Sequence, residues 1–145
     1  MWRRTGILLV VVALSLGGCG WLGASSVSHR KPDAFLLRGR VTVAVTAGDA
    51  RPDGAACAAT VPDLVAGTTV RVTGPDATLL GVGYLGDGVI ARNGSASTCE
   101  FPFQIPNVAG GVDSYDIAVG ARAPQRFAAK DLRENAEAVI MITGD

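Results

Sequence analysis

Four residues have side chains typical of reactive or metal-binding centres: the three cysteines Cys19, Cys57 and Cys99, and the only histidine, His29. A thiol serves as a nucleophile, a metal ligand, a disulfide partner or a site of lipid attachment. A histidine-based catalytic or metal site has no second histidine to draw on. His29 is therefore interpreted as a solvated linker residue, and the chemistry of this chain depends on its cysteines.

The sequence before Cys19 has the features of an export signal. Arg3 and Arg4 precede an apolar run of 11 residues, from Gly6 to Leu16. A helix needs about 20 apolar residues to cross a bilayer, so this run is too short to span and has the length of a secretory signal core. The run ends in Leu16-Gly17-Gly18-Cys19, which resembles the bacterial lipobox. In lipoproteins the cysteine thiol receives a diacylglycerol, and signal peptidase II cuts immediately before it.

This pattern predicts three segments: a lipoprotein signal peptide at 1–18, a lipidated flexible tether at 19–34, and a folded domain at 35–145. Two acyl chains anchor a protein stably, whereas one chain binds only marginally. The predicted location is the outer, extracytoplasmic face of the cell membrane, with the diacylglycerol on Cys19 as the membrane contact. The alternative is an ordinary secretory signal in which Cys19 falls by chance.

The other two cysteines are predicted to form a structural disulfide. Export brings the chain into an oxidising compartment, where lipidation consumes Cys19 and leaves only Cys57 and Cys99. A redox-active pair is the alternative, but the sequence has no Cys-x-x-Cys motif.

The segments that must position these cysteines alternate between apolar and polar residues, as half-buried strands do. The alternating runs are 37–46, 69–73, 99–105 and 115–119, and the run Val139–Ile142 is apolar throughout, as in a strand buried on both faces. Glycine-rich turns separate the runs, and the segment 128–135 could form a turn or two of helix. Pro102 indicates an edge position or a bulge. We therefore predict an all-β, antiparallel, immunoglobulin-like sandwich of about seven strands with one short helical turn near the C-terminus.

Several motifs imitate binding sites. The segment Gly81–Gly86 matches the G-x-G-x-x-G dinucleotide fingerprint, but no helical pattern follows it, so the glycines indicate a strand bend or a close approach of another backbone. Asp49 and Asp53 could hold calcium, but their loop lacks the ligand density of a known motif and is interpreted as a solvated turn. Asn93-Gly94-Ser95 has the form of a glycosylation site and is interpreted as a turn. We predict no metal site, no cofactor and no catalytic residue.

At the level of the domain, the chain resembles a group of small secreted and lipid-anchored proteins of actinobacteria, mycobacteria included, whose function is unknown. The resemblance covers residues 41–143 and includes Cys57 and Cys99, the segments 67–72 and 115–120, and the Phe-rich strand after Cys99. It implies a sandwich with a paired cysteine bridge and adds no site. Gly74-Pro75-Asp76-Ala77 departs from the Asp/Gly hairpin turn expected of the group.

Charge gives little indication of a partner. The chain has 13 basic and 13 acidic side chains, and removal of Arg3 and Arg4 with the signal leaves 11 against 13. This balance argues against nucleic acid as a partner. The sequence favours a lipid-anchored binding or interaction domain, not an enzyme, whose partner is an unknown envelope protein or ligand. A small carrier of lipid or another apolar ligand is the alternative, and it requires an apolar cavity of several hundred Å³.

Overall fold

The computed structural model describes residues 33–46, 48–134 and 136–143. This part of the chain forms eight strands and a five-residue helix. In chain order they are β1 (Ala34–Ala44), β2 (Thr69–Thr73), β3 (Leu79–Tyr84), β4 (Val89–Asn93), β5 (Ala96–Ala109), β6 (Ser114–Val119), β7 (Gln125–Ala128), α1 (Ala129–Arg133) and β8 (Ala138–Ile142). The helix lies inside the predicted segment 128–135. No helix within these ranges is long and apolar enough to cross a membrane.

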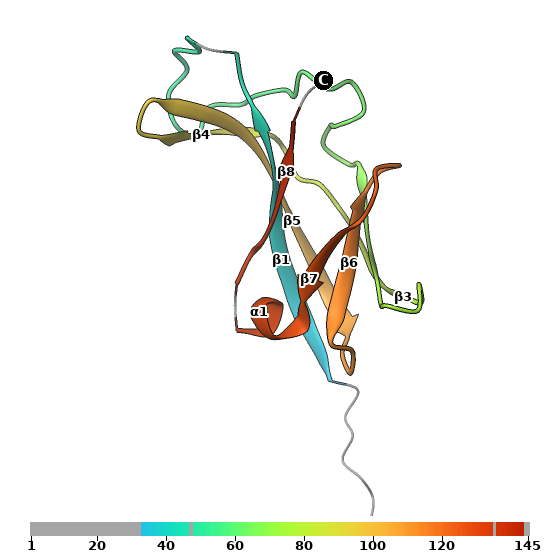
Figure 1. Cartoon of the computed structure of the whole chain (residues 1–145). Coiled ribbons are helices and arrows are strands. Elements are labelled where there is room, and N and C mark those ends of the chain that lie inside the picture. The colour runs from blue at the N-terminus through green and yellow to red at the C-terminus, as the bar shows by residue number, and fades with distance from the viewer. Residues whose placement is uncertain (1–32, 47, 135, 144–145) are drawn as a thin grey trace, which may run out of the picture. The chain divides into compact units, whose positions relative to one another are not determined.

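The strands form two four-stranded sheets that pack face to face (Figure 1), in the orders β4-β5-β1-β8 and β3-β2-β6-β7. Neighbouring strands are antiparallel except β1 and β8, which pair in parallel with Val41 opposite Ile140. The predicted all-β sandwich is confirmed, with eight strands where about seven were expected. The parallel pair joins the first strand to the last, so no local sequence pattern predicts it.

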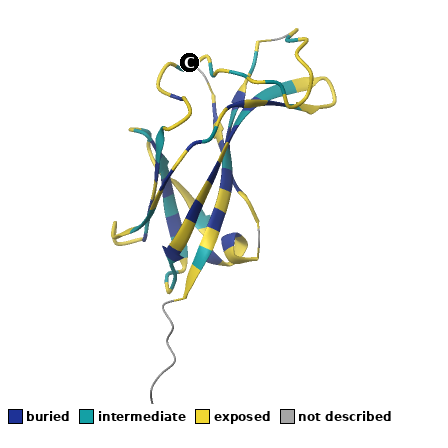
Figure 2. Cartoon of the chain, turned by 180° about the vertical axis from the view of Figure 1, so that it is seen from behind, coloured by how far each residue is buried: buried dark blue, intermediate teal, exposed yellow. Residues whose placement is uncertain are grey.

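The hydrophobic core lies between the sheets, and Figure 2 shows buried and exposed residues alternating along the strands. The predicted alternation in the runs at 37–46, 69–73, 99–105 and 115–119 is confirmed. The buried side chains of these runs are Leu37, Val41, Val43, Val70, Val72, Cys99, Phe101, Phe103, Ile105, Tyr115, Ile117 and Val119. The hydroxyl of Tyr115 donates to the carbonyl of Ala109 over 3.1 Å, which satisfies the polar end of the largest fully buried side chain.

In β8 only alternate residues are buried. Ala138, Ile140 and Ile142 face the core, whereas Val139 is 38% exposed and Met141 is 71% exposed. The prediction that this apolar run is buried on both faces is therefore wrong. β8 is the last strand of its sheet, and the second sheet covers only one of its faces.

β3 approaches β5 of the opposite sheet very closely, and glycines make this possible. A Cβ atom on Gly81 would lie 3.1 Å from the side chain of Ile105, and one on Gly83 would lie 2.6 Å from it. The N–H of Gly86 then donates to the carbonyl of Pro102 over 2.7 Å. The predicted close approach is confirmed, and strand β4 follows where a dinucleotide site would need a helix.

Pro102 is tolerated because one side of β5 is open where it lies. β1 pairs with β5 at Pro102, but β4 pairs with β5 only as far as Glu100. The carbonyl of Pro102 points to the open side, where it accepts a hydrogen bond from the N–H of Gly86. The backbone nitrogen of Pro102 points to the same side. The missing N–H therefore costs no bond to β1, and the predicted edge position is confirmed for this half of β5.

Candidate functional site

The disulfide joins the long loop after β1 to strand β5 of the β4-β5-β1-β8 sheet. Cys57 and Cys99 are bonded with a Cα–Cα distance of 5.9 Å, which confirms the predicted pairing. Cys99 is fully buried in β5, and Cys57 is half-buried. The bond therefore ties the loop to a buried strand, and its structural role stays a prediction.

The residues just before Cys57 cover the outer edge of β4. We call residues 52–57 the edge cover. The N–H of Gly54 donates to the carbonyl of Ile90, and the N–H of Ile90 donates to the carbonyl of Ala55, each over 2.8 Å. The N–H of Cys57 donates to the carbonyl of Gly88 over 2.9 Å. The edge cover therefore satisfies the backbone groups that an edge strand would otherwise present to a neighbouring molecule.

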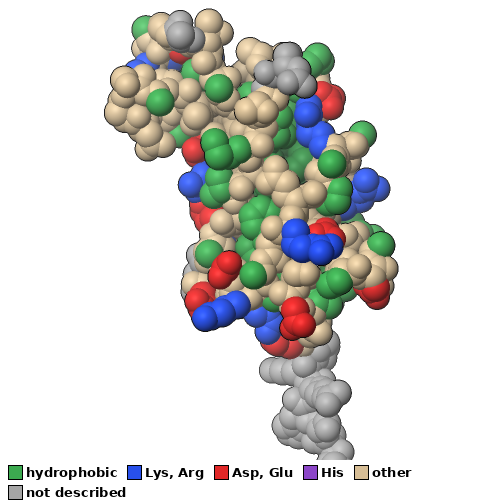
Figure 3. Space-filling model, in the orientation of Figure 1, with side chains coloured by type: hydrophobic (Ala, Val, Ile, Leu, Met, Phe, Trp, Pro, Cys, Tyr) green, Lys and Arg blue, Asp and Glu red, His purple; other side chains and the backbone are tan. Residues whose placement is uncertain are grey.

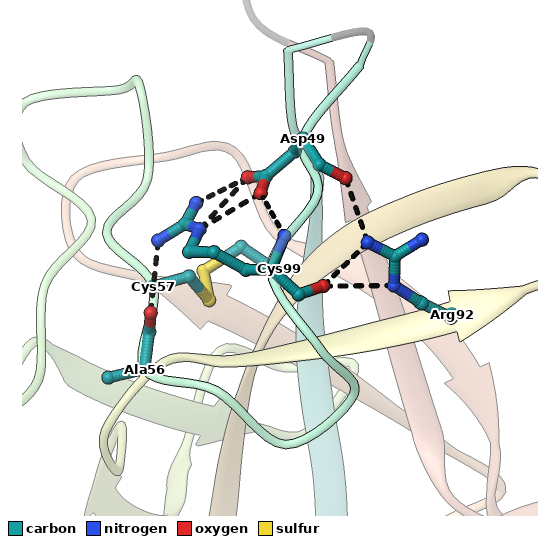
Figure 4. Close-up of polar contacts among 6 residues, drawn as sticks. Asp49, Ala56, Cys57, Arg92 and Cys99 are labelled. Atoms are coloured by element: carbon teal, nitrogen blue, oxygen red, sulfur yellow. Dashed lines mark hydrogen bonds and ion pairs between the residues drawn. A yellow bond between two sulfur atoms is a disulfide. The ribbon is translucent and has the colours of Figure 1, made fainter.

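Two arginines hold the edge cover in place (Figure 4). The side chain of Arg51 donates to both carboxylate oxygens of Asp49 and to the carbonyl of Ala56, over 2.5 to 3.1 Å. Arg92, in β4, donates to the carbonyls of Asp49 and Arg51 over 2.6 to 2.9 Å. The N–H of Arg92 donates to the carboxylate of Asp53 over 3.0 Å. We call the side chains of Asp49, Arg51, Asp53 and Arg92 the arginine clamp.

The arginine clamp accounts for both acidic residues that the sequence offered as calcium ligands. Hydrogen bonds from the side chain of Arg51, and then from its backbone N–H, lower the pKa of Asp49 from 3.8 to about 2. Asp53 is bonded to the backbone of β4. Both carboxylates therefore stabilise the loop. Within the described ranges, no three His, Cys, Asp or Glu side chains gather as metal ligands would.

An exposed apolar row lies on the outer face of the other sheet. Leu79, Val82 and Tyr84 of β3 are 56%, 42% and 63% exposed. Val82 and Tyr84 point outward because they alternate with Gly81 and Gly83, which face β5. Leu79 lies beyond an irregularity in the register between β2 and β3. Sequence reasoning missed this row, although the inward glycines were the signal that could have found it.

Arg71 lies beside the apolar row, on the neighbouring strand β2 and opposite Val82. Two surface hollows meet at its side chain: one of about 330 Å³, which includes Thr69 and Gly120, and one of about 450 Å³, which includes Leu79, Ala118, Arg122 and Pro124. Among the described residues, Arg71 makes no ion pair, whereas Arg122 pairs with Asp63 over 3.1 Å. Arg71, the apolar row and the two hollows together form what we call the β3 face.

Elsewhere the surface is electrostatically mixed. On the side that Figure 3 shows, basic and acidic side chains are interspersed, and neither sign gathers into a large patch. A third hollow, of about 460 Å³, lies beside the arginine clamp between the end of β1 and the β4–β5 hairpin. The turn of that hairpin is Gly94-Ser95, as the sequence predicted.

Cys19 and His29 lie outside the described residues. The lipidation of Cys19 and the linker role of His29 therefore stay predictions. The domain to which the tether would connect begins with β1 at Ala34, at the end of the sandwich that also carries α1 (Figure 1). Arg133 of α1 forms an ion pair with Asp33 at this end.

Comparisons with known proteins found no relative of this chain. No protein-family model matches the chain, and no curated protein and no solved structure matches it significantly. The resemblance of residues 41–143 to small actinobacterial lipoproteins therefore stays a prediction.

Proposed function

We propose that this protein is a lipid-anchored interaction domain on the extracytoplasmic face of the cell membrane. The anchor rests on the sequence before Cys19, with two arginines, a short apolar run and a lipobox-like ending. The disulfide between Cys57 and Cys99 suits a compartment in which thiols are oxidised. The proposed partner is an envelope protein or ligand that binds the domain without being chemically changed.

The β3 face is the observation that carries the interaction role. Large apolar side chains that remain exposed in a row mark a contact surface more often than isolated ones do. Tyrosine and arginine are also the residue types that contribute most at protein interfaces. Arg71 forms no ion pair with any residue that the structure describes, so the partner is expected to place an acidic group there and apolar groups on Val82 and Tyr84.

The carrier alternative receives less support from the same hollows. A carrier needs an apolar cavity inside the sandwich. The three hollows of 330 to 460 Å³ are lined by exposed or half-buried residues, and none of their lining residues belongs to the buried core. Between the sheets, Gly81 and Gly83 lie in tight contact with Ile105. These contacts favour a filled core and a binding surface on the outside.

In-cell photo-crosslinking tests the interaction role. A photoreactive amino acid is placed at Val82 of the full chain, and the matched control is placed at Gln104, an exposed position on the other sheet. We expect discrete crosslinked products from Val82, weaker products from Gln104, and loss of the Val82 products when Arg71→Met is added. Equal products from both positions, or no effect of Arg71→Met, would contradict the assignment of this face.

Membrane fractionation tests the anchor separately. Cys19→Ala is expected to move the protein out of the membrane fraction, because no acyl chain is then attached. Mass spectrometry of the parent protein is expected to find a lipid-modified cysteine as its first residue. An unmodified or different first residue would support an ordinary secretory signal instead.

A further inference from the structure

The outer edge of β8 is open in the described part of the chain. The edge strand β3 of the other sheet is also unpaired on one side, but its two glycines weaken it as a pairing strand. β4 has the edge cover, and β5 has Pro102 on its open side. β7 is only four residues long and carries Arg126, which pairs with Asp116. β8 pairs with β1 on one side, and no described residue forms a strand on its other side. Natural sheets usually protect such edges with charges, prolines, bulges or covering loops.

The sequence of β8 adds none of these protections. Ala138-Val139-Ile140-Met141-Ile142 has no charged residue, no proline and no glycine. Both outward side chains are apolar, and Met141 is the most exposed of the large hydrophobic residues in the described part of the chain. An uncharged apolar strand at an open edge is a ready template for pairing with another strand.

We propose that β8 pairs antiparallel with β8 of a second copy of this chain, about a twofold axis through Ile140. Residue numbers then sum to 280 across the pair, so Val139 lies opposite Met141 of the second copy, and Ala138 lies opposite Ile142. Every cross-strand pair is apolar, and no like charges meet. The strand is therefore complementary to itself, as a twofold interface requires.

This register also preserves the two faces of the sheet. A twofold axis perpendicular to the sheet keeps both outer faces on the same side. Val139 and Met141 of the two copies then cover one another, while Ala138, Ile140 and Ile142 stay on the core side. The two sheets join into one with β4, sealed by the edge cover, at both ends. A five-residue strand gives a smaller contact than the roughly 800 Å² per partner of a stable complex, so the pairing is expected to be weak and concentration-dependent.

Register-specific disulfide trapping tests the proposal. Two differently tagged full chains are made, one with Val139→Cys and one with Met141→Cys, and they are mixed under mild oxidation. Opposite residues in antiparallel strands lie about 4.5–5.5 Å apart between Cα atoms, which a disulfide spans. Like positions, offset by two residues, lie roughly 8 Å apart and beyond that reach. We expect the mixed pair to crosslink at least tenfold faster than either variant alone. The parent chain, which lacks an added cysteine, measures any crosslinking that comes from Cys19.

A competition experiment keeps the test independent of the added cysteines. Excess parent chain is expected to suppress the mixed crosslink, and Tyr84→Lys, which places the same charge on the β3 face, is expected to suppress it equally. Met141→Lys is expected to compete at least tenfold more weakly, because it brings charge into the paired edge. Val139→Lys serves as a second variant, and unfolding curves show that each competitor is folded.

Several results would overturn self-pairing. One is equal crosslinking in like and mixed samples, and another is undiminished competition by both lysine variants. A third is a crosslink from β8 to a different protein in membranes, which would make β8 a docking edge for that protein. A mixed-pair crosslink that Met141→Lys fails to compete away supports the proposal.

Discussion

The two edges of the β4-β5-β1-β8 sheet are treated very differently by this chain. At β4, the edge cover supplies backbone partners, the arginine clamp holds the cover, and the disulfide fixes its end to the core. At β8, five apolar residues end the sheet without a described neighbour. A loop and a disulfide thus close one edge of this sheet, whereas no described residue pairs with the other edge.

Loss of the disulfide is expected to have the largest effect on the sealed edge. Cys57 and Cys99 close a loop with a sequence separation of 42, for which the chain-entropy model gives about 4 kcal/mol. The double variant Cys57→Ala/Cys99→Ala is expected to lower the free energy of unfolding by about 2–5 kcal/mol, measured by denaturant titration. A loss below about 1 kcal/mol would show that the edge cover holds without its covalent link.

Gly88→Ala is expected to disturb the same edge through crowding. A Cβ atom there would lie 2.6 Å from the carbonyl oxygen of Cys57 and 2.8 Å from the ring of Phe101. Because a backbone oxygen cannot move aside as a flexible side chain can, we expect a loss of about 1–3 kcal/mol in unfolding free energy. Hydrogen exchange at Ile90 should rise as well, and an unchanged exchange rate would mean that the edge cover tolerates the shift.

Arg92→Met is expected to loosen the edge cover with a smaller loss. The side chain of Arg92 gives up three bonds to the carbonyls of Asp49 and Arg51, which we expect to cost about 1 kcal/mol. The matched control is Arg38→Met, an exposed arginine of β1, for which we expect a change within about 0.5 kcal/mol. Equal effects of the two variants would remove the arginine clamp from the explanation.

Acid is expected to have the smallest effect, and its effect on the edge cover is expected to arise at Asp49. Its pKa falls from 3.8 to about 2 in the folded chain, so the clamp is fully effective above about pH 4. Between pH 4 and 2 the unfolded chain binds a proton at Asp49 more readily than the folded chain does, so the stabilisation declines as the pH falls and is lost below about pH 2. The protection of residues 52–57 against hydrogen exchange, relative to the intrinsic rate at each pH, should fall between pH 4 and 2. Asp49→Asn, which already lacks the charge, should show no such step; a step of equal size in that variant would place the titration elsewhere.

The sequence predicted the parts of the fold that depend on local patterns. Alternation found the central strands, the glycines of β3 indicated a close approach, and export chemistry indicated the disulfide. It did not find β7, a four-residue strand with no clear alternation, or the parallel pairing of β1 with β8.

The arginine clamp was beyond sequence reasoning for a different reason. Asp53 bonds to the backbone of Arg92, 39 residues away. The sequence of the loop, which was interpreted as a solvated turn, does not indicate that the loop covers β4. The apolar run of β8 was misread because an edge strand and a buried strand can have the same composition. In both cases, the missing information was the neighbour of an edge, which only the tertiary structure supplies.

Hydrogen exchange of the full chain at several concentrations tests the difference between the two edges most directly. The amide of Ile90, bonded to Ala55, is expected to stay protected at every concentration. The β8 amides that point away from β1 are expected to exchange fast in dilute protein and more slowly as the concentration rises. Equal protection of both edges in dilute protein, or β8 exchange that never changes with concentration, would contradict the account.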